Sequence, residues 1–227
     1  MTTTIPKITP RVLSKRARRY MMVKDILDRL LALILLLLLW WLLAIVALVV
    51  ILDDGRPAIF TQERVGQHGK TFRIYKFRTM KRSAPKSQPT HLLGDPRQYL
   101  TRSGAFLRRS SLDELPQLVN ILLGQMSFVG PRPVVPNQGD LLALRHENMA
   151  EQVRPGLTGW AQINGRDEVT EEEKAWLDGE YVAHMGFWMD IRCFFGTVLP
   201  VLRQQGVAEG KRKEKQASGR HNPTKHP

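Results

Sequence analysis

Two adjacent carboxylates, Asp113 and Glu114, are the residues of this sequence best placed to do chemistry. The pair Arg108-Arg109 lies shortly before them, and the apolar residues that follow recur at the i, i+3, i+4 and i+7 spacing of one helix face. Pro116 is tolerated only in the first turn of such a helix. We therefore expect the helix to begin at Asp113 or Glu114 and to end near Gly124.

This stretch has a structural and a chemical interpretation. Ser111 and Glu114 fit the capping-box pattern of a helix start, and the helix dipole favours acidic residues in a first turn whatever the protein does. A carboxylate held ionised at a positive helix end can also act as a nucleophile, with its neighbour binding a metal or orienting it. Taken alone, this stretch favours the structural interpretation. The choice between the two interpretations therefore depends on the rest of the sequence.

Composition limits the class of protein. With 227 residues and 43% apolar content, one folded domain with appendages is expected. A net charge of +13 implies an anionic partner, which can be nucleic acid, an acidic membrane surface or a phosphorylated substrate. The single cysteine, Cys193, excludes an internal disulfide.

Residues 30–52 form an unbroken run of 23 apolar residues. As a helix this run is about 34 Å long, enough to cross a hydrocarbon core of roughly 30 Å. Residues 1–29 and residues 53–82 each carry eight Lys or Arg, so positive-inside counting gives a tie. Such a tie is typical of a segment that enters and leaves the membrane on the same face.

The remaining sequence alternates extended and helical patterns. Residues 58–65 and 71–80 predict a β-hairpin, and residues 83–97 predict a loop. Arg132 lies between two prolines on stiff backbone, which favours gripping an anion. Residues 154–166 look rich in turns, and Thr170 with Glu173 predicts a second capping box at a helix start.

The C-terminal part carries one more apolar segment. Residues 186–202 are apolar and aromatic but too short and polar to span a bilayer, so they either lie in the interface or pack on the domain core. The basic residues from 206 onward predict a disordered tail. The expected organisation is a basic segment (1–23), a membrane helix (24–54), an α+β catalytic domain (55–205) and the tail (206–227).

Four motifs, at residues 75–80, 112–117, 130–133 and 154–160, resemble those of the bacterial sugar transferase family. These are the monotopic phosphoglycosyl transferases that start glycoconjugate assembly on polyprenyl phosphate. The resemblance covers roughly residues 24–203. It implies transfer of a sugar 1-phosphate from a UDP-sugar to a polyprenyl (undecaprenyl) phosphate, with Mg²⁺ and release of UMP.

The resemblance also implies roles for residues. Asp113 is expected to be the nucleophile, to form an aspartyl-phosphosugar intermediate and to contact the metal, with Glu114 assisting it. A carboxylate that attacks a diphosphate meets like-charge repulsion, so a divalent metal and convergent cations agree with this chemistry. The positions implied for binding the substrate are Lys76, Arg78, Arg108, Arg132, Arg154 and Arg166.

One feature departs from the family. Its membrane segment usually carries Ser-Pro near the middle, which turns the helix back, whereas this chain has Trp40-Trp41 there. A helix without a breaker keeps all its hydrogen bonds in a straight crossing. The tied charges and the cytoplasmic supply of nucleotide sugars nevertheless favour a re-entrant segment, which is our prediction, with a straight crossing as the alternative.

The expected setting is therefore the bacterial inner membrane, with a cytoplasmic catalytic domain. The expected partners are membrane lipid, both substrates and, downstream, further glycosyltransferases, but no nucleic acid. The alternative is an inactive membrane-anchored scaffold whose basic surface binds anionic lipid or nucleic acid. A two-carboxylate glycosidase is excluded because neighbouring helix residues point about 100° apart and cannot flank one bond.

Overall fold

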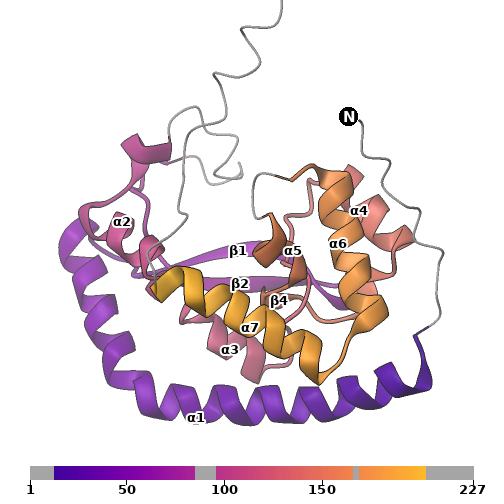
Figure 1. Cartoon of the computed structure of the whole chain (residues 1–227). Coiled ribbons are helices and arrows are strands. Elements are labelled where there is room, and N and C mark those ends of the chain that lie inside the picture. Colours follow the sequence, from indigo (N-terminus) through magenta and orange to yellow (C-terminus); the bar gives the residue numbers. More distant parts are fainter. Residues whose placement is uncertain (1–12, 85–95, 166–168, 203–227) are drawn as a thin grey trace, which may run out of the picture.

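One long helix, α1 (Lys15–Asp54), runs along two sides of the rest of the chain in the computed structural model (Figure 1). The structure describes residues 13–84, 96–165 and 169–202. The helix begins at Lys15 rather than at the predicted residue 24, because the Ser14 side chain caps it by accepting a hydrogen bond from the Ala17 amide at 3.1 Å. Among the described residues, α1 alone is long and apolar enough to cross a membrane.

Helix α1 bends sharply, so that its first part passes beneath the domain and its second part rises along the side (Figure 1). Ala32 on the first part is fully buried against Ile121 and its neighbours. Val46 and Val50 on the second part pack on Phe77 and Leu107. The bend contains no Pro, Gly or Ser, and the helix packs in different buried clusters on its two sides.

The predicted hairpin is present. Strand β1 (Ile59–Val65) pairs antiparallel with β2 (Thr71–Phe77), with Ile59 opposite Phe77 and Val65 opposite Thr71. The short η1 turn (Gln67–Gly69) joins the strands. The second strand stops at Phe77, short of the predicted end at residue 80. The Arg78 amide still donates to the Ala58 carbonyl at 2.8 Å, while the Arg78 side chain turns towards the end of α1.

The helix start predicted at Asp113 or Glu114 is wrong. After α2 (Arg102–Arg109), the chain forms a 3₁₀ turn, η4 (Leu112–Glu114), and the α-helix α3 (Gln117–Leu122) begins only after Pro116. The capping box is absent because Ser111 is left-handed, with φ 57°, and Glu114 is bound by other residues. The predicted end is confirmed: Gly124 follows α3 with φ 73°.

Two short strands, β3 (Ser127–Val129) and β4 (Gly156–Thr158), pair in parallel. The described part of the stretch predicted to be rich in turns, residues 154–165, is therefore a strand followed by the helix α5 (Trp160–Asn164), rather than a series of turns. A Cβ on Gly159 would lie only 2.1 Å from the Gly130 carbonyl oxygen, so the two motifs meet backbone to backbone. This contact fixes where the turn after β3 points.

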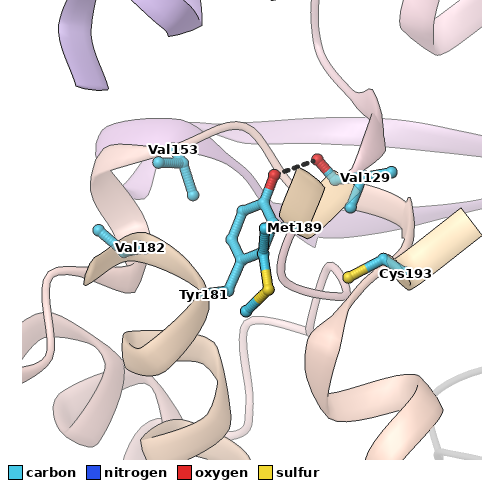
Figure 2. Packing of buried hydrophobic residues seen from close by; sticks show 6 residues of the cluster. All are labelled: Val129, Val153, Tyr181, Val182, Met189 and Cys193. Atoms are coloured by element: carbon cyan, nitrogen blue, oxygen red, sulfur yellow. Dashed lines mark hydrogen bonds between the residues drawn. The ribbon is translucent and has the colours of Figure 1, made fainter. Parts of the chain in front are cut away.

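Helices α4 (Gly139–Glu147), α6 (Glu171–His184) and α7 (Phe187–Leu202) complete the fold. The capping box of Thr170 and Glu173 at the start of α6 is confirmed. Tyr181 on α6 lies among Val129, Val153, Val182, Met189 and Cys193, and its hydroxyl lies 3.1 Å from the Val129 carbonyl oxygen (Figure 2). The short η3 (Pro96–Tyr99) and η5 (Ala150–Gln152) turns connect elements.

Residues 186–202 pack on the domain core through one face, and their place in a membrane interface stays a prediction. One face of α7 is buried, through Met189 and Cys193, whereas Phe187, Trp188 and Phe194 on the other face are about half exposed or more. Most of the loop predicted at 83–97 and the tail predicted from 206 lie outside the described residues. The mixed helix and sheet architecture agrees with the α+β class.

Candidate active site

The Asp113-Glu114 pair lies in the η4 turn between α2 and α3, not at the first turn of a helix. The Asp113 side chain is buried, with the residue only 8% exposed. Helix α2 sets this position from one side, because Leu107 is buried against α1 and Phe77. The left-handed Ser111 then turns the chain, and Glu114 reaches Lys76 on the hairpin.

Glu114 binds two cations from different elements. Its Oε1 lies 2.5 Å from Nζ of Lys76 on β2 and 3.1 Å from Nη2 of Arg132 in the turn after β3. The Lys76 and Glu114 side chains are 18% and 19% exposed, whereas that of Arg132 is half exposed. Glu114 thus joins three segments that lie far apart in the sequence.

The two carboxyl groups have different proton affinities. Burial, together with the charge of Glu114, raises the pKa of Asp113 to about 6, against the opposing charges of Lys76, Arg108 and Arg132. Burial alone would also raise the pKa of Glu114, but Lys76 and Arg132 outweigh it and lower the pKa to about 2. Glu114 is therefore the fixed anion of the site, and Asp113 is the group that titrates near neutrality.

Two further arginines complete the cluster. Nε of Arg108 donates a hydrogen bond of 2.9 Å to the Thr79 hydroxyl, and its charge acts on Asp113. Arg64 on β1 was not among the predicted site residues, yet it donates to the Pro133 carbonyl at 3.1 Å. Burial and the charge of Arg132 lower the pKa of Arg64 to about 10. The alternating pattern of β1 could have suggested Arg64, because it places this side chain on the less exposed face of the strand.

The structure uses two of the predicted substrate-binding cations elsewhere. Nη2 of Arg78 lies 2.8 and 2.6 Å from the carbonyl oxygens of Asp54 and Gly55, at the C-terminal end of α1. Arg154 forms an ion pair with Asp25 on the first part of α1. Of the predicted set, Lys76, Arg108 and Arg132 gather with Asp113 and Glu114, and Arg166 lies outside the described residues.

The described residues hold no cluster of three or more metal-ligating side chains. A site built from one or two carboxylates plus substrate phosphates is nevertheless the usual arrangement for Mg²⁺. Since Glu114 is bound by Lys76 and Arg132, Asp113 is the carboxylate available to such an ion. The donor set therefore fits Mg²⁺ that arrives with a phosphorylated substrate, but not a permanent protein-only site.

Residues 19–204 match the family model described as bacterial sugar transferase. The chain belongs to this family. It is 41% identical to EpsL of Bacillus subtilis (strain 168), named an uncharacterized sugar transferase, over 83% of this chain and 92% of that protein. The resemblance stated from the sequence motifs is thus confirmed.

Two longer relatives carry names that state a reaction. The chain is 38% identical to the undecaprenyl-phosphate galactose phosphotransferase of Salmonella typhimurium, over 68% of this chain. It is 43% identical to the UDP-glucose:undecaprenyl-phosphate glucose-1-phosphate transferase of Escherichia coli (strain K12), over 63% of this chain. The matches span only 35% and 32% of those proteins.

The position of Arg78 leads to a prediction that separates anchoring from substrate binding. Arg78→Met should lower the free energy of unfolding by about 2 kcal/mol, because it removes charge-assisted hydrogen bonds from the buried Arg78 to the carbonyl oxygens at the end of α1. Thermal unfolding of the detergent-solubilised protein measures this. Arg73→Met, at an exposed position of the preceding strand β2, is the control and should change stability little. Unchanged stability in Arg78→Met with a raised KM for the donor would return Arg78 to the substrate site.

Proposed function

We propose that this protein transfers a sugar 1-phosphate from a UDP-sugar to undecaprenyl phosphate, releases UMP and so initiates glycoconjugate or exopolysaccharide assembly. The observation that carries the proposal is the buried Asp113, with a pKa of about 6, beside a carboxylate that Lys76 and Arg132 hold ionised. The names of the relatives support the class of donor and acceptor. The sequence family supports the reaction type.

Asp113 is the nucleophile in this proposal. One Oδ attacks the phosphorus next to the sugar, the bond from that phosphorus to the bridging oxygen breaks, and its electron pair leaves with UMP. The product is an acyl phosphate that joins Asp113 to the phosphosugar. A phosphate oxygen of undecaprenyl phosphate then attacks the same phosphorus, and the carboxylate of Asp113 leaves unchanged. No oxidant or further reactant is needed.

The surrounding cations make this attack possible. A carboxylate approaching a diphosphate is repelled by its charge, and Lys76, Arg108 and Arg132 all act on Asp113. Arg132 is half exposed and stands on stiff backbone, which suits it to an incoming phosphate. Mg²⁺, held by Asp113 and substrate phosphates, would neutralise further negative charge when bound. Full turnover in excess EDTA would contradict a role for the metal.

The contacts of α1 support a membrane segment whose two ends emerge on one face. Lys24 on the first part lies 2.7 Å from Asp190 of α7. Near the other end, Asp53 accepts hydrogen bonds of 2.7 Å from the Ser103 amide and hydroxyl. Both parts are thus fastened to one domain, which a straight crossing would separate. We place this domain on the cytoplasmic side of the bacterial inner membrane, where nucleotide sugars are supplied.

The inactive scaffold is the less favoured function. A basic surface that only binds anionic lipid or nucleic acid does not need a buried carboxylate such as Asp113, because burying a carboxylate costs free energy. Salt-sensitive lipid binding without metal-dependent turnover would restore this alternative.

The assignment of Asp113 predicts the behaviour of Asp113→Asn. This variant should lose UMP release by at least about a thousandfold with a panel of UDP-sugars, undecaprenyl phosphate and Mg²⁺, because an amide is a poor nucleophile. Wild-type protein given only the UDP-sugar should gain the mass of one phosphosugar, and the variant should not. Asp140→Asn, an exposed carboxylate on α4, is the matched control and should remain active. Normal turnover in Asp113→Asn would show that Asp113 is not the nucleophile.

The raised pKa of Asp113 predicts an acid limb in the rate profile. Attack requires the ionised carboxylate, so kcat/KM should fall about tenfold per pH unit below pH 6 and level off above it. Arg132→Ala removes a charge that lowers this pKa, so the limb should move to higher pH in the variant. Profiles from about pH 5 to about pH 8 with sub-saturating donor measure both. A limb that stays in place, or moves to lower pH, would contradict the coupling.

The same-face topology predicts equal access at two distant positions. In a Cys193→Ser background, single cysteines at Thr4 and at the exposed Gly139 should both resist an impermeant thiol reagent in intact cells. Both should react after permeabilisation. Labelling at position 4 alone in intact cells would mean that α1 is an ordinary transmembrane helix.

A further inference from the structure

The turn that carries Arg132 is held from behind by a second arginine. Arg145 on α4 is buried, and its Nη1 donates a hydrogen bond of 2.8 Å to the backbone carbonyl of Arg132. The side chain of Arg132 meanwhile points away to Glu114. Arg145 therefore contacts the backbone of the turn that carries the exposed side chain of Arg132. These contacts of Arg145 do not involve Glu114 or Asp113.

Arg145 is itself fixed by a carboxylate on another helix. Its Nε and Nη2 lie 2.8 and 2.6 Å from Oδ2 of Asp178 on α6. Asp178 is 1% exposed, and burial raises its pKa against the opposing charge of Arg145. A buried ion pair is often no more stabilising than well-packed apolar residues of similar volume. The pairing with Asp178 therefore does not by itself explain why charged residues occupy these positions. The hydrogen bond from Arg145 to the Arg132 carbonyl is a contact that apolar residues could not replace.

Val134 of the turn region packs in a buried cluster with Leu141 and Ala175, but the turn also borders a pocket. This pocket, of about 340 Å³, is bounded by Pro131 and Val134 of the turn region, by Arg145, and by residues of the hairpin end and η5. The hydrogen bond from Arg145, one of the residues that line this pocket, adds a restraint on the Arg132 carbonyl there.

We propose that Arg145 and Asp178 are a positioning pair, which holds the Arg132 turn so that Arg132 faces Glu114 and the incoming phosphate. This inference rests on the proposed function and names a further part of the same site. The requirement is for a planar guanidinium, because one group donates a hydrogen bond to the Asp178 carboxylate through Nε and another to the Arg132 carbonyl through Nη1, in fixed directions. An ammonium at the same place reaches one partner at a time.

A double-mutant cycle tests whether Arg145 acts through Arg132. Arg145→Lys should lower kcat/KM for the donor about tenfold, the loss expected for one hydrogen bond to a charged group. In an Arg132→Ala background, measured at raised enzyme concentration, the same change should cost less than about twofold. An equal loss in both backgrounds would show a general structural effect and overturn the proposal. So would an unchanged kcat/KM in Arg145→Lys.

A second measurement does not depend on turnover. The Gly156 amide donates to the Pro131 carbonyl and the Val65 amide donates to the Val134 carbonyl, both at 2.9 Å, so these amides report on the two sides of the turn. Their hydrogen exchange, followed by mass spectrometry in detergent, should be several times faster in Arg145→Lys and in Asp178→Asn. If these amides exchange as slowly in both variants as in the wild type, the proposal is overturned. This result can be obtained even if no UDP-sugar proves to be a substrate.

Leu177→Ala is the matched control for both measurements. Leu177 is buried on α6 next to Asp178, and its truncation destabilises the same helix without removing a polar contact. It should leave exchange at the two reporting amides and kcat/KM within about twofold of wild type, apart from a lower unfolding temperature. If Leu177→Ala reproduces the effects of Arg145→Lys, the pair has only a structural role. Absence of wild-type turnover would instead count against the proposed function.

Discussion

The contact of Glu114 with Lys76 and Arg132 is the interaction on which the site depends. It joins β2, the η4 turn and the turn after β3, none of which are neighbours in the sequence. A buried carboxylate with two cations is stable only when all three groups stay together, because a partner left alone would carry an uncompensated charge. The arrangement therefore orients Asp113, which is covalently next to Glu114, without binding it directly. The proposed nucleophile is thus placed by the ion pairs of its neighbour.

The backbone around this contact is held with little freedom. Gly130, Gly156 and Gly159 allow the β3 and β4 segments to approach more closely than any side chain would permit. A similar approach occurs at Gly104 of α2, where a Cβ would lie 2.1 Å from the Thr79 carbonyl oxygen, beside the hydroxyl that Arg108 binds. Rigid backbone contacts of this kind keep cations at fixed separations, which stabilises charge that develops during a reaction.

Much of this could be predicted from the sequence, and the exceptions have physical reasons. The hairpin, the membrane helix, the cap at Thr170 and the gathering of Asp113, Glu114 and Arg132 all follow local patterns or motifs. The capping box at Ser111 failed because a long-range ion pair took the carboxylate that the box requires.

The roles of the arginines were harder to assign. Arg78 and Arg154 carry the same charge as Arg132, and only the path of α1 decides that they meet Asp54 and Asp25 instead of the catalytic cluster. The pair of Arg145 and Asp178 joins residues 33 positions apart and has no local signature, so no reading of short motifs would find it.

The bent helix α1 is structurally a part of the catalytic domain. Its side chains enter three separate clusters of buried residues, with Met21 beside α7, Ala32 beside α3, and Val46 and Val50 beside β2 and α2. A lipid anchor attached by a flexible linker could be exchanged for another anchor, or cut away to give a soluble enzyme. Here the anchor is part of the core, so removing it would uncover apolar faces on several elements at once. Attachment to the bilayer and folding of the domain are thus one property of this chain.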